Sequence, residues 1–119
     1  MTAVARIFHV RSDGVIELDG VPAAMPAQGF VWVSVPRPAF EAEHPAWQEH
    51  VVALTGAPLV DLHVSDLINR QLPSHFDSTS RYDMLIVRRL LALPGDDADP
   101  RALPAIDTSP VGFAVFDRL

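Results

Sequence analysis

The sequence predicts an α/β domain in which a mixed β-sheet is layered with helices. Runs of β-branched and apolar residues lie toward both ends of the chain, and two stretches with helical periodicity lie between them. Strands, then helices, then strands again is the order expected of a sheet covered by helices. The chain has 119 residues, which suits one core, so we treat residues 1–119 as a single domain.

The N-terminal stretch, residues 4–18, predicts a β-hairpin. On a strand, residues 4, 6, 8 and 10 would lie on one face and residues 5, 7 and 9 on the other, and this stretch is rich in β-branched residues. Residues 12–14, Ser-Asp-Gly, are a typical turn. Residues 15–18 then return as the second strand.

A third strand is predicted at residues 30–35, an apolar run that Pro36 ends. Because both faces of this strand carry apolar side chains, we expect it to be buried at the centre of the sheet. Trp32 within it is expected to anchor the core.

Two helices are predicted in the middle of the chain. The first spans residues 45–54, because proline suits its first position and Gly56 can close it in the left-handed conformation. The second spans residues 62–70, with Asp61 as its N-cap. The apolar stripe of the first helix consists of Trp47, Val51 and Leu54.

Two strands are predicted in the C-terminal half. Residues 82–93 are the most apolar run, and a strand would place Tyr82, Met84 and Ile86 on one face. Residues 111–116 form the last strand, whose sequence partner we place beyond Leu119, so we expect self-association or fraying there.

Two arginines, Arg88 and Arg89, interrupt the apolar run of residues 82–93. We expect one of them to pair with an acidic residue. The other is expected to face solvent or a neighbouring subunit.

Composition excludes several kinds of chemistry. The net charge is −6, which disfavours nucleic acid as a partner. All nine basic residues are arginine and there is no cysteine, which excludes lysine Schiff bases, thiolate nucleophiles and disulfides within the chain. No apolar run reaches the roughly 18 residues that a membrane-spanning helix needs.

The acidic residues Asp96, Asp97 and Asp99 invite a calcium-loop interpretation. A loop begun at Asp96 would have alanine, proline and arginine at three positions that need ligands or glycine. We therefore interpret residues 94–100 as a solvated loop.

Asp61, His63 and Asp66 form a tighter set. His63 and Asp66 are three residues apart and share a helix face, but two ligands could hold a transition metal only with others. The interpretation we favour is that Asp61 is a helix cap and His63 a surface residue. For Asp66, the plain interpretation is an acid on the exposed face of the helix, and it stands as the alternative to any metal-binding role.

Ser74, His75 and Asp77 include the residue types of a hydrolytic triad. Adjacent residues in an extended segment point to opposite faces, so they cannot line up as nucleophile and base. The sequence also lacks a Gly-x-Ser-x-Gly elbow. We expect no enzyme activity.

The segments 62–77 (LHVSDLINRQLPSHFD) and 82–89 (YDMLIVRR) resemble the N-terminal cytoplasmic domain of CorA-type divalent-cation transporters. In that family an Asp-Leu/Ile-Leu/Ile-Asn helix end is followed by a proline, an acidic residue, a tyrosine and an apolar strand. The likeness extends over residues 30–119. The matching residues are Asp66, Leu67, Ile68, Asn69, Pro73, Asp77, Tyr82 and 85–87.

The resemblance implies that the chain is the N-terminal part of the cytoplasmic domain of a transporter whose membrane part is absent here. In the family this domain belongs to the funnel of a homopentamer at the cytoplasmic face of the inner membrane. Magnesium bound between subunits bridges acidic side chains and holds the channel closed. Asp66 matches the sensing aspartate, whereas its often acidic neighbour is Ser65 here.

Several features of the family are missing from these residues: the long stalk helix, the two membrane helices and the Gly-Met-Asn motif. The carboxylate that partners Asp66 would come from the stalk helix, so we expect residues 1–119 alone to hold Mg²⁺ weakly and not to retain it. The alternative interpretation is a stand-alone domain that binds a small ligand or another protein.

Overall fold

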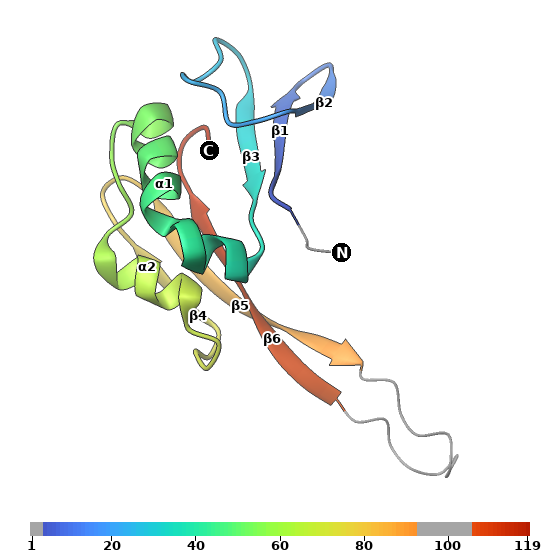
Figure 1. The fold of residues 1–119 in the computed structure, drawn as a ribbon, viewed down its shortest axis with the longest axis vertical. Coiled ribbons are helices and arrows are strands. Elements are labelled where there is room, and N and C mark those ends of the chain that lie inside the picture. Colours follow the sequence, from blue (N-terminus) through green and yellow to red (C-terminus); the bar gives the residue numbers. More distant parts are fainter. Residues whose placement is uncertain (1–3, 93–105) are drawn as a thin grey trace.

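The computed structural model describes residues 4–92 and 106–119, which form six strands and two helices (Figure 1). In chain order these are β1 (Arg6–Arg11), β2 (Gly14–Leu18), β3 (Phe30–Ser34), α1 (Arg37–Thr55), α2 (Asp61–Ile68), β4 (His75–Ser78), β5 (Asp83–Ala92) and β6 (Ile106–Val115). The predicted α/β class is confirmed. The acidic loop predicted at residues 94–100 lies outside the described residues.

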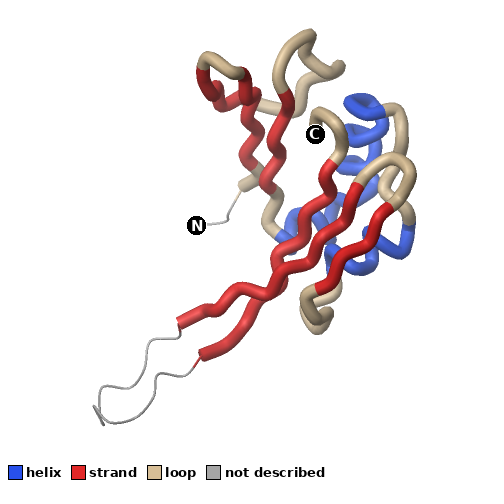
Figure 2. The backbone as a smooth tube through the Cα atoms, turned by 180° about the vertical axis from the view of Figure 1, so that it is seen from behind, coloured by secondary structure: helices blue, strands red, loops and turns tan. Residues whose placement is uncertain are grey.

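The strands are divided between two antiparallel sheets, with the orders β2-β1-β3 and β4-β5-β6. Both helices lie against one side of the second sheet (Figure 2). One mixed sheet was expected, and this expectation is corrected. A backbone hydrogen bond from the Val31 N–H to the Arg118 carbonyl joins β3 to the segment after β6, over 2.9 Å.

The hairpin predicted at residues 4–18 is confirmed, since β1 pairs with β2 across a turn that closes at Arg11 and Gly14. The prediction for β3 is wrong in its position, because β1 is the central strand and β3 lies at an edge of this sheet. Val31 is fully buried, but Trp32 on the opposite face is 49% exposed. Trp32 is therefore not a core anchor.

Helix α1 begins eight residues before the predicted start, directly after Pro36. Pro45 is inside the helix, and the backbone departs from helical angles at Glu43. A proline within a helix lacks an N–H and clashes with the preceding turn, which explains a kink here. The predicted end is confirmed, because Gly56 is left-handed (φ 83°) and its N–H donates to the Val52 carbonyl over 2.8 Å.

Helix α2 begins one residue before the predicted start. Val60 occupies the N-cap position, and no side chain caps the helix. The N-cap assignment of Asp61 is therefore wrong: it is the first helical residue. The helix ends at Ile68 because Asn69 has an extended backbone, with its side-chain oxygen accepting the Gln71 N–H over 2.9 Å.

Strand β5 confirms the predicted alternation and lies at the centre of the second sheet. Tyr82, just before it, and Met84 and Ile86 within it are buried, whereas Val87 on the other face is 46% exposed. Strand β6 begins at Ile106, five residues before the predicted start, and β5 pairs with its whole length. The expectation that its partner lies beyond Leu119 is therefore wrong. Strand β4 was not predicted.

Two groups of buried apolar residues form the core. The larger lies between α2 and the second sheet and consists of Leu59, Val64, Tyr82, Met84, Ile86 and Phe116. The smaller lies between the first sheet and the end of α1 and consists of Ile7, Val31 and Leu54. Leu119 packs against both groups. In the described part of the chain, no helix is long and apolar enough to cross a membrane.

Candidate functional site

The residues that gave the family resemblance come together where α2 packs on β4 and β5. Helix α2 turns His63 and Val64 inward, toward the face of β5 that carries Met84 and Ile86. Strand β4 pairs with β5 so that Asp77 lies opposite Met84. A histidine, a tyrosine and an aspartate thereby meet across three separate segments.

His63 is the centre of this group and is 1% exposed. Its Nδ1 lies 2.6 Å from the Tyr82 hydroxyl, and its Nε2 lies 2.6 Å from Oδ2 of Asp77. The Tyr82 hydroxyl also accepts the Val60 N–H over 3.0 Å. We call His63, Tyr82 and Asp77 the buried triad.

One arrangement of protons satisfies all of these contacts. The Tyr82 hydroxyl accepts from Val60, so its own proton is free to be donated to Nδ1 of His63. Nδ1 then acts as an acceptor, and the proton of the neutral ring sits on Nε2, where it is donated to Asp77. With this tautomer every polar group of the buried triad has a hydrogen-bond partner.

The pKa values of the two partners shift in opposite directions. The hydrogen bond from His63 holds the pKa of the Asp77 carboxyl below its ordinary value. Burial raises the pKa of the Tyr82 hydroxyl. At neutral pH, therefore, Asp77 is charged and Tyr82 keeps its proton.

Acid, histidine and hydroxyl follow one another here in the order of a catalytic triad. A nucleophile must be reachable by its substrate, however, and Tyr82 is 4% exposed with its hydroxyl already engaged by Val60 and His63. This geometry suits a polar bridge that fixes α2 on β5. Its hydrogen bonds connect the loop before α2, the helix itself and β4 to Tyr82 just before β5.

Asp66 lies one helical turn after His63, near the outer end of the same helix. Its side chain is 17% exposed, and Oδ2 lies 3.6 Å from Nε2 of His75. Asp66 is thus half-buried and faces a histidine, in contrast to the exposed helix acid of the alternative interpretation. The adjacent Ser65 is exposed.

The structure does not assemble the metal set considered from the sequence. Asp61 is exposed, His63 points into the core and Asp66 points toward His75. Within residues 4–92 and 106–119, no three or more His, Asp or Glu side chains gather closely enough to hold a metal ion. Asp66 therefore offers a single carboxylate.

Ser74, His75 and Asp77 have three different partners, as the analysis of the extended segment predicts. The Ser74 hydroxyl accepts the Arg88 N–H over 2.9 Å. His75 faces Asp66, and Asp77 bonds to His63.

Sequence reasoning missed the buried triad because it took His63 for a surface residue. The spacing held the missing information: His63 and Leu67 are four residues apart, so they share the inward face of α2. Tyr82 stands at the start of the most apolar strand, where its hydroxyl needs a partner. Asp77 was named in the family resemblance and in the rejected hydrolytic triad, but its contact with His63 depends on the pairing of β4 with β5, which no local pattern predicts.

The comparisons with known proteins identify no family. The chain matches no protein-family model and no curated protein.

Proposed function

We propose that this chain is a cytoplasmic regulatory domain of a CorA-type divalent metal ion transporter, gated by intracellular Mg²⁺ bound between subunits. Asp66 would supply one carboxylate, and a second subunit would supply the other. The proposal places the domain at the cytoplasmic face of the inner membrane, in a homopentamer.

The observation that supports it most is the setting of Asp66. The buried triad fixes α2 through His63, and Asp66 lies on the next turn of that helix. A carboxylate on a fixed helix can bind a cation without the entropy cost of ordering its own backbone. Among the residues that the structure describes, no arginine forms an ion pair with the Asp66 carboxylate, whose near neighbour is His75.

The donor set fits half of a magnesium site. Mg²⁺ prefers oxygen ligands and keeps several waters, so one carboxylate from each of two subunits is a reasonable set. Asp66 would hold the ion through its carboxylate, and the ion would supply charge neutralisation between acidic surfaces. With one carboxylate and a net charge of −6, neighbouring domains would repel one another when the ion leaves.

The gene offers a direct test. Reading the coding sequence after the codon for Leu119 should reveal a long helical segment and two apolar stretches of about 20 residues each. A stop codon at that point would contradict the transporter proposal.

A second candidate function is a stand-alone domain that binds a small ligand. A cavity of about 730 Å³ between β3, α1 and β6 favours it. Cavities of about 300–1,000 Å³ are typical of small-molecule sites.

A further inference from the structure

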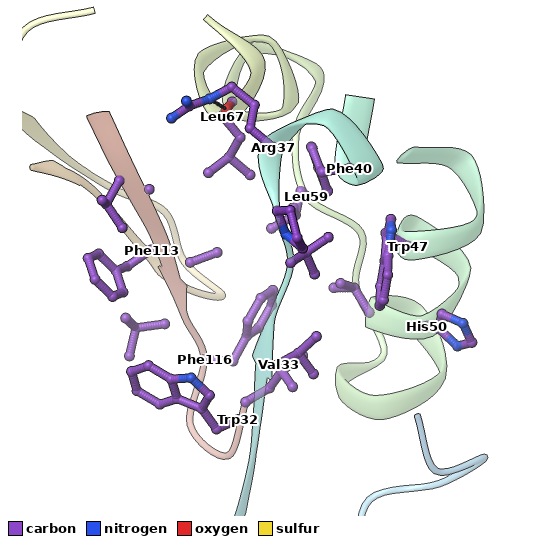
Figure 3. A pocket seen from close by; sticks show the side chains of 18 of the residues that line it. Trp32, Val33, Arg37, Phe40, Trp47, His50, Leu59, Leu67, Phe113 and Phe116 are labelled. Carbon is purple, nitrogen blue, oxygen red and sulfur yellow. Dashed lines mark hydrogen bonds between the residues drawn. The ribbon is translucent and has the colours of Figure 1, made fainter. Parts of the chain in front are cut away.

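The cavity between β3, α1 and β6 is mostly apolar (Figure 3). It has a volume of about 730 Å³ and lies where the two sheets diverge from their contact at Val31 and Arg118. Most of its lining residues come from these three elements and the segments that flank them. They include Trp32, Val33, Phe40, Trp47, Phe113 and Phe116.

One end of the cavity carries positive charge. Arg37 lies there, with Nε donating to the Leu67 carbonyl over 3.1 Å and Nη2 donating to the Pro110 carbonyl. Figure 3 shows Arg37 beside Leu67, at the end away from Trp32. Arg89 also lines the cavity, from its position opposite Ser109 in the β5–β6 register.

No acidic side chain neutralises this end in the described part of the chain. Neither Arg37 nor Arg89 forms an ion pair with a described residue, and the Arg89 side chain donates no hydrogen bond to one. We expected one of Arg88 and Arg89 to pair with an acidic residue. Arg88 donates instead to the backbone carbonyls of Arg70, Leu72 and Thr108.

The charges around Arg37 reinforce this picture. Burial lowers the pKa of the Arg37 guanidinium, and the nearby positive charges of Arg70, Arg88 and Arg89 lower it further. In a chain with a net charge of −6, this is a local concentration of cations.

The two ends of the cavity differ in their polar groups. The indole Nε1 of Trp47 is buried and has no hydrogen-bond partner among the described residues, so this N–H could donate to a ligand. The acid that lines the cavity, Asp117, lies seven residues after Pro110. Asp117 therefore lies beyond the end of β6, whereas Pro110, whose carbonyl accepts from Arg37, lies within the strand.

We propose that this cavity binds an amphipathic monocarboxylate, with its alkyl chain along the apolar walls and its carboxylate between Arg37 and Arg89. Burial of an alkyl chain against aromatic side chains supplies the larger part of the affinity. The two guanidinium groups select an anion over a neutral or cationic head group. This site is separate from Asp66 and does not depend on the proposed cation role.

Decanoate is the probe that tests this proposal, and decanol is its neutral match. Both tryptophans of the chain line the cavity, so their intrinsic fluorescence reports occupancy. We expect a saturable change with decanoate at neutral pH, at least tenfold tighter than with decanol. Decanoate should also raise the melting temperature, because it binds the folded state.

Arg89→Gln is the informative variant, because Arg89 is exposed and the fold does not depend on it. It should weaken decanoate binding about two- to fivefold and leave decanol binding unchanged, as expected for a partly exposed charge pair. Arg11→Gln, in the β1–β2 turn, is the matched control and should change neither.

Three outcomes would overturn the proposal. The first is equal affinity for decanoate and decanol, which would leave an unspecific apolar groove. The second is unchanged decanoate binding by Arg89→Gln. The third is occupation of the cavity by protein, seen as a dimer or a bound extended peptide whose formation abolishes the decanoate-induced change in fluorescence.

Discussion

The two sheets of this protein are held by different means. Sheet β4-β5-β6 has a helix-covered face on which Tyr82, Met84 and Ile86 are almost completely buried. In sheet β2-β1-β3 the described buried residues are Ile7 and Val31, and every residue of β2 is exposed or half-buried. The first sheet thus relies more on backbone pairing, and the second on side-chain burial.

The buried triad adds to this difference. It joins α2, β4 and the start of β5 through three hydrogen bonds, and it lies entirely in the helix-covered half. Buried polar groups with every partner in place fix one arrangement of a core. We therefore expect the half that positions Asp66 to open last.

The largest expected effect is in the core of the second sheet. Met84 is fully buried, so Met84→Ala should lower the free energy of unfolding by about 2–5 kcal/mol. Ile16→Ala, at a 52% exposed position of β2, should cost about 0.5 kcal/mol or less. Urea denaturation of both variants measures the difference. Equal losses would mean that the two halves are equally well packed.

Tyr82→Phe should give the next largest effect. It keeps the ring but leaves the Val60 N–H and Nδ1 of His63 without a partner, which should cost about 1–3 kcal/mol. A double-mutant cycle with His63→Gln should show coupling of at least about 0.5 kcal/mol. Strictly additive losses would show that the two side chains do not act together.

Acid should weaken the second half through Asp77. Because its folded-state pKa lies below the unfolded value of about 3.9, the stability it contributes is complete above that pH. It is lost as the pH falls through the folded-state pKa. Asp77→Asn should therefore be less stable than the wild type at pH 7 and approach it below about pH 4. Glu49→Gln, an exposed acid on α1, is the control and should follow the wild type throughout.

The smallest effect is expected in the hairpin. Arg6 and Glu17 form an exposed ion pair, with Nε and Oε1 2.8 Å apart. Water screens such pairs, so Glu17→Gln should leave the urea midpoint unchanged within error. A clear loss would show that side-chain pairing, and not the backbone alone, holds the first sheet.

The same comparison explains what could be predicted from the sequence. Local periodicity predicts β5 and the β1–β2 hairpin because each pattern lies within one segment. The extent of α1 was missed because Pro45 was taken as a start and not as a kink. Trp32 was misjudged, and the partner of Asp77 was missed, because their surroundings come from distant segments: β6 and α1 line the cavity beside Trp32, and α2 supplies the histidine that Asp77 bonds.

Asp66 was singled out by the family resemblance, and the structure adds its half-buried setting beside His75. Neither composition nor spacing would have separated it from Asp61, five residues earlier on the same helix. The two acids differ in their surroundings, which makes Asp61 the matched control for Asp66.

Limited proteolysis of the full-length protein in which we propose this domain to act, with and without Mg²⁺, tests the central claim most directly. Mg²⁺ should protect the wild type and Asp61→Ala, whereas Asp66→Ala should remain sensitive at Mg²⁺ concentrations that protect both. Protection of Asp66→Ala equal to that of the wild type would contradict the account and leave Asp66 as an ordinary helix acid.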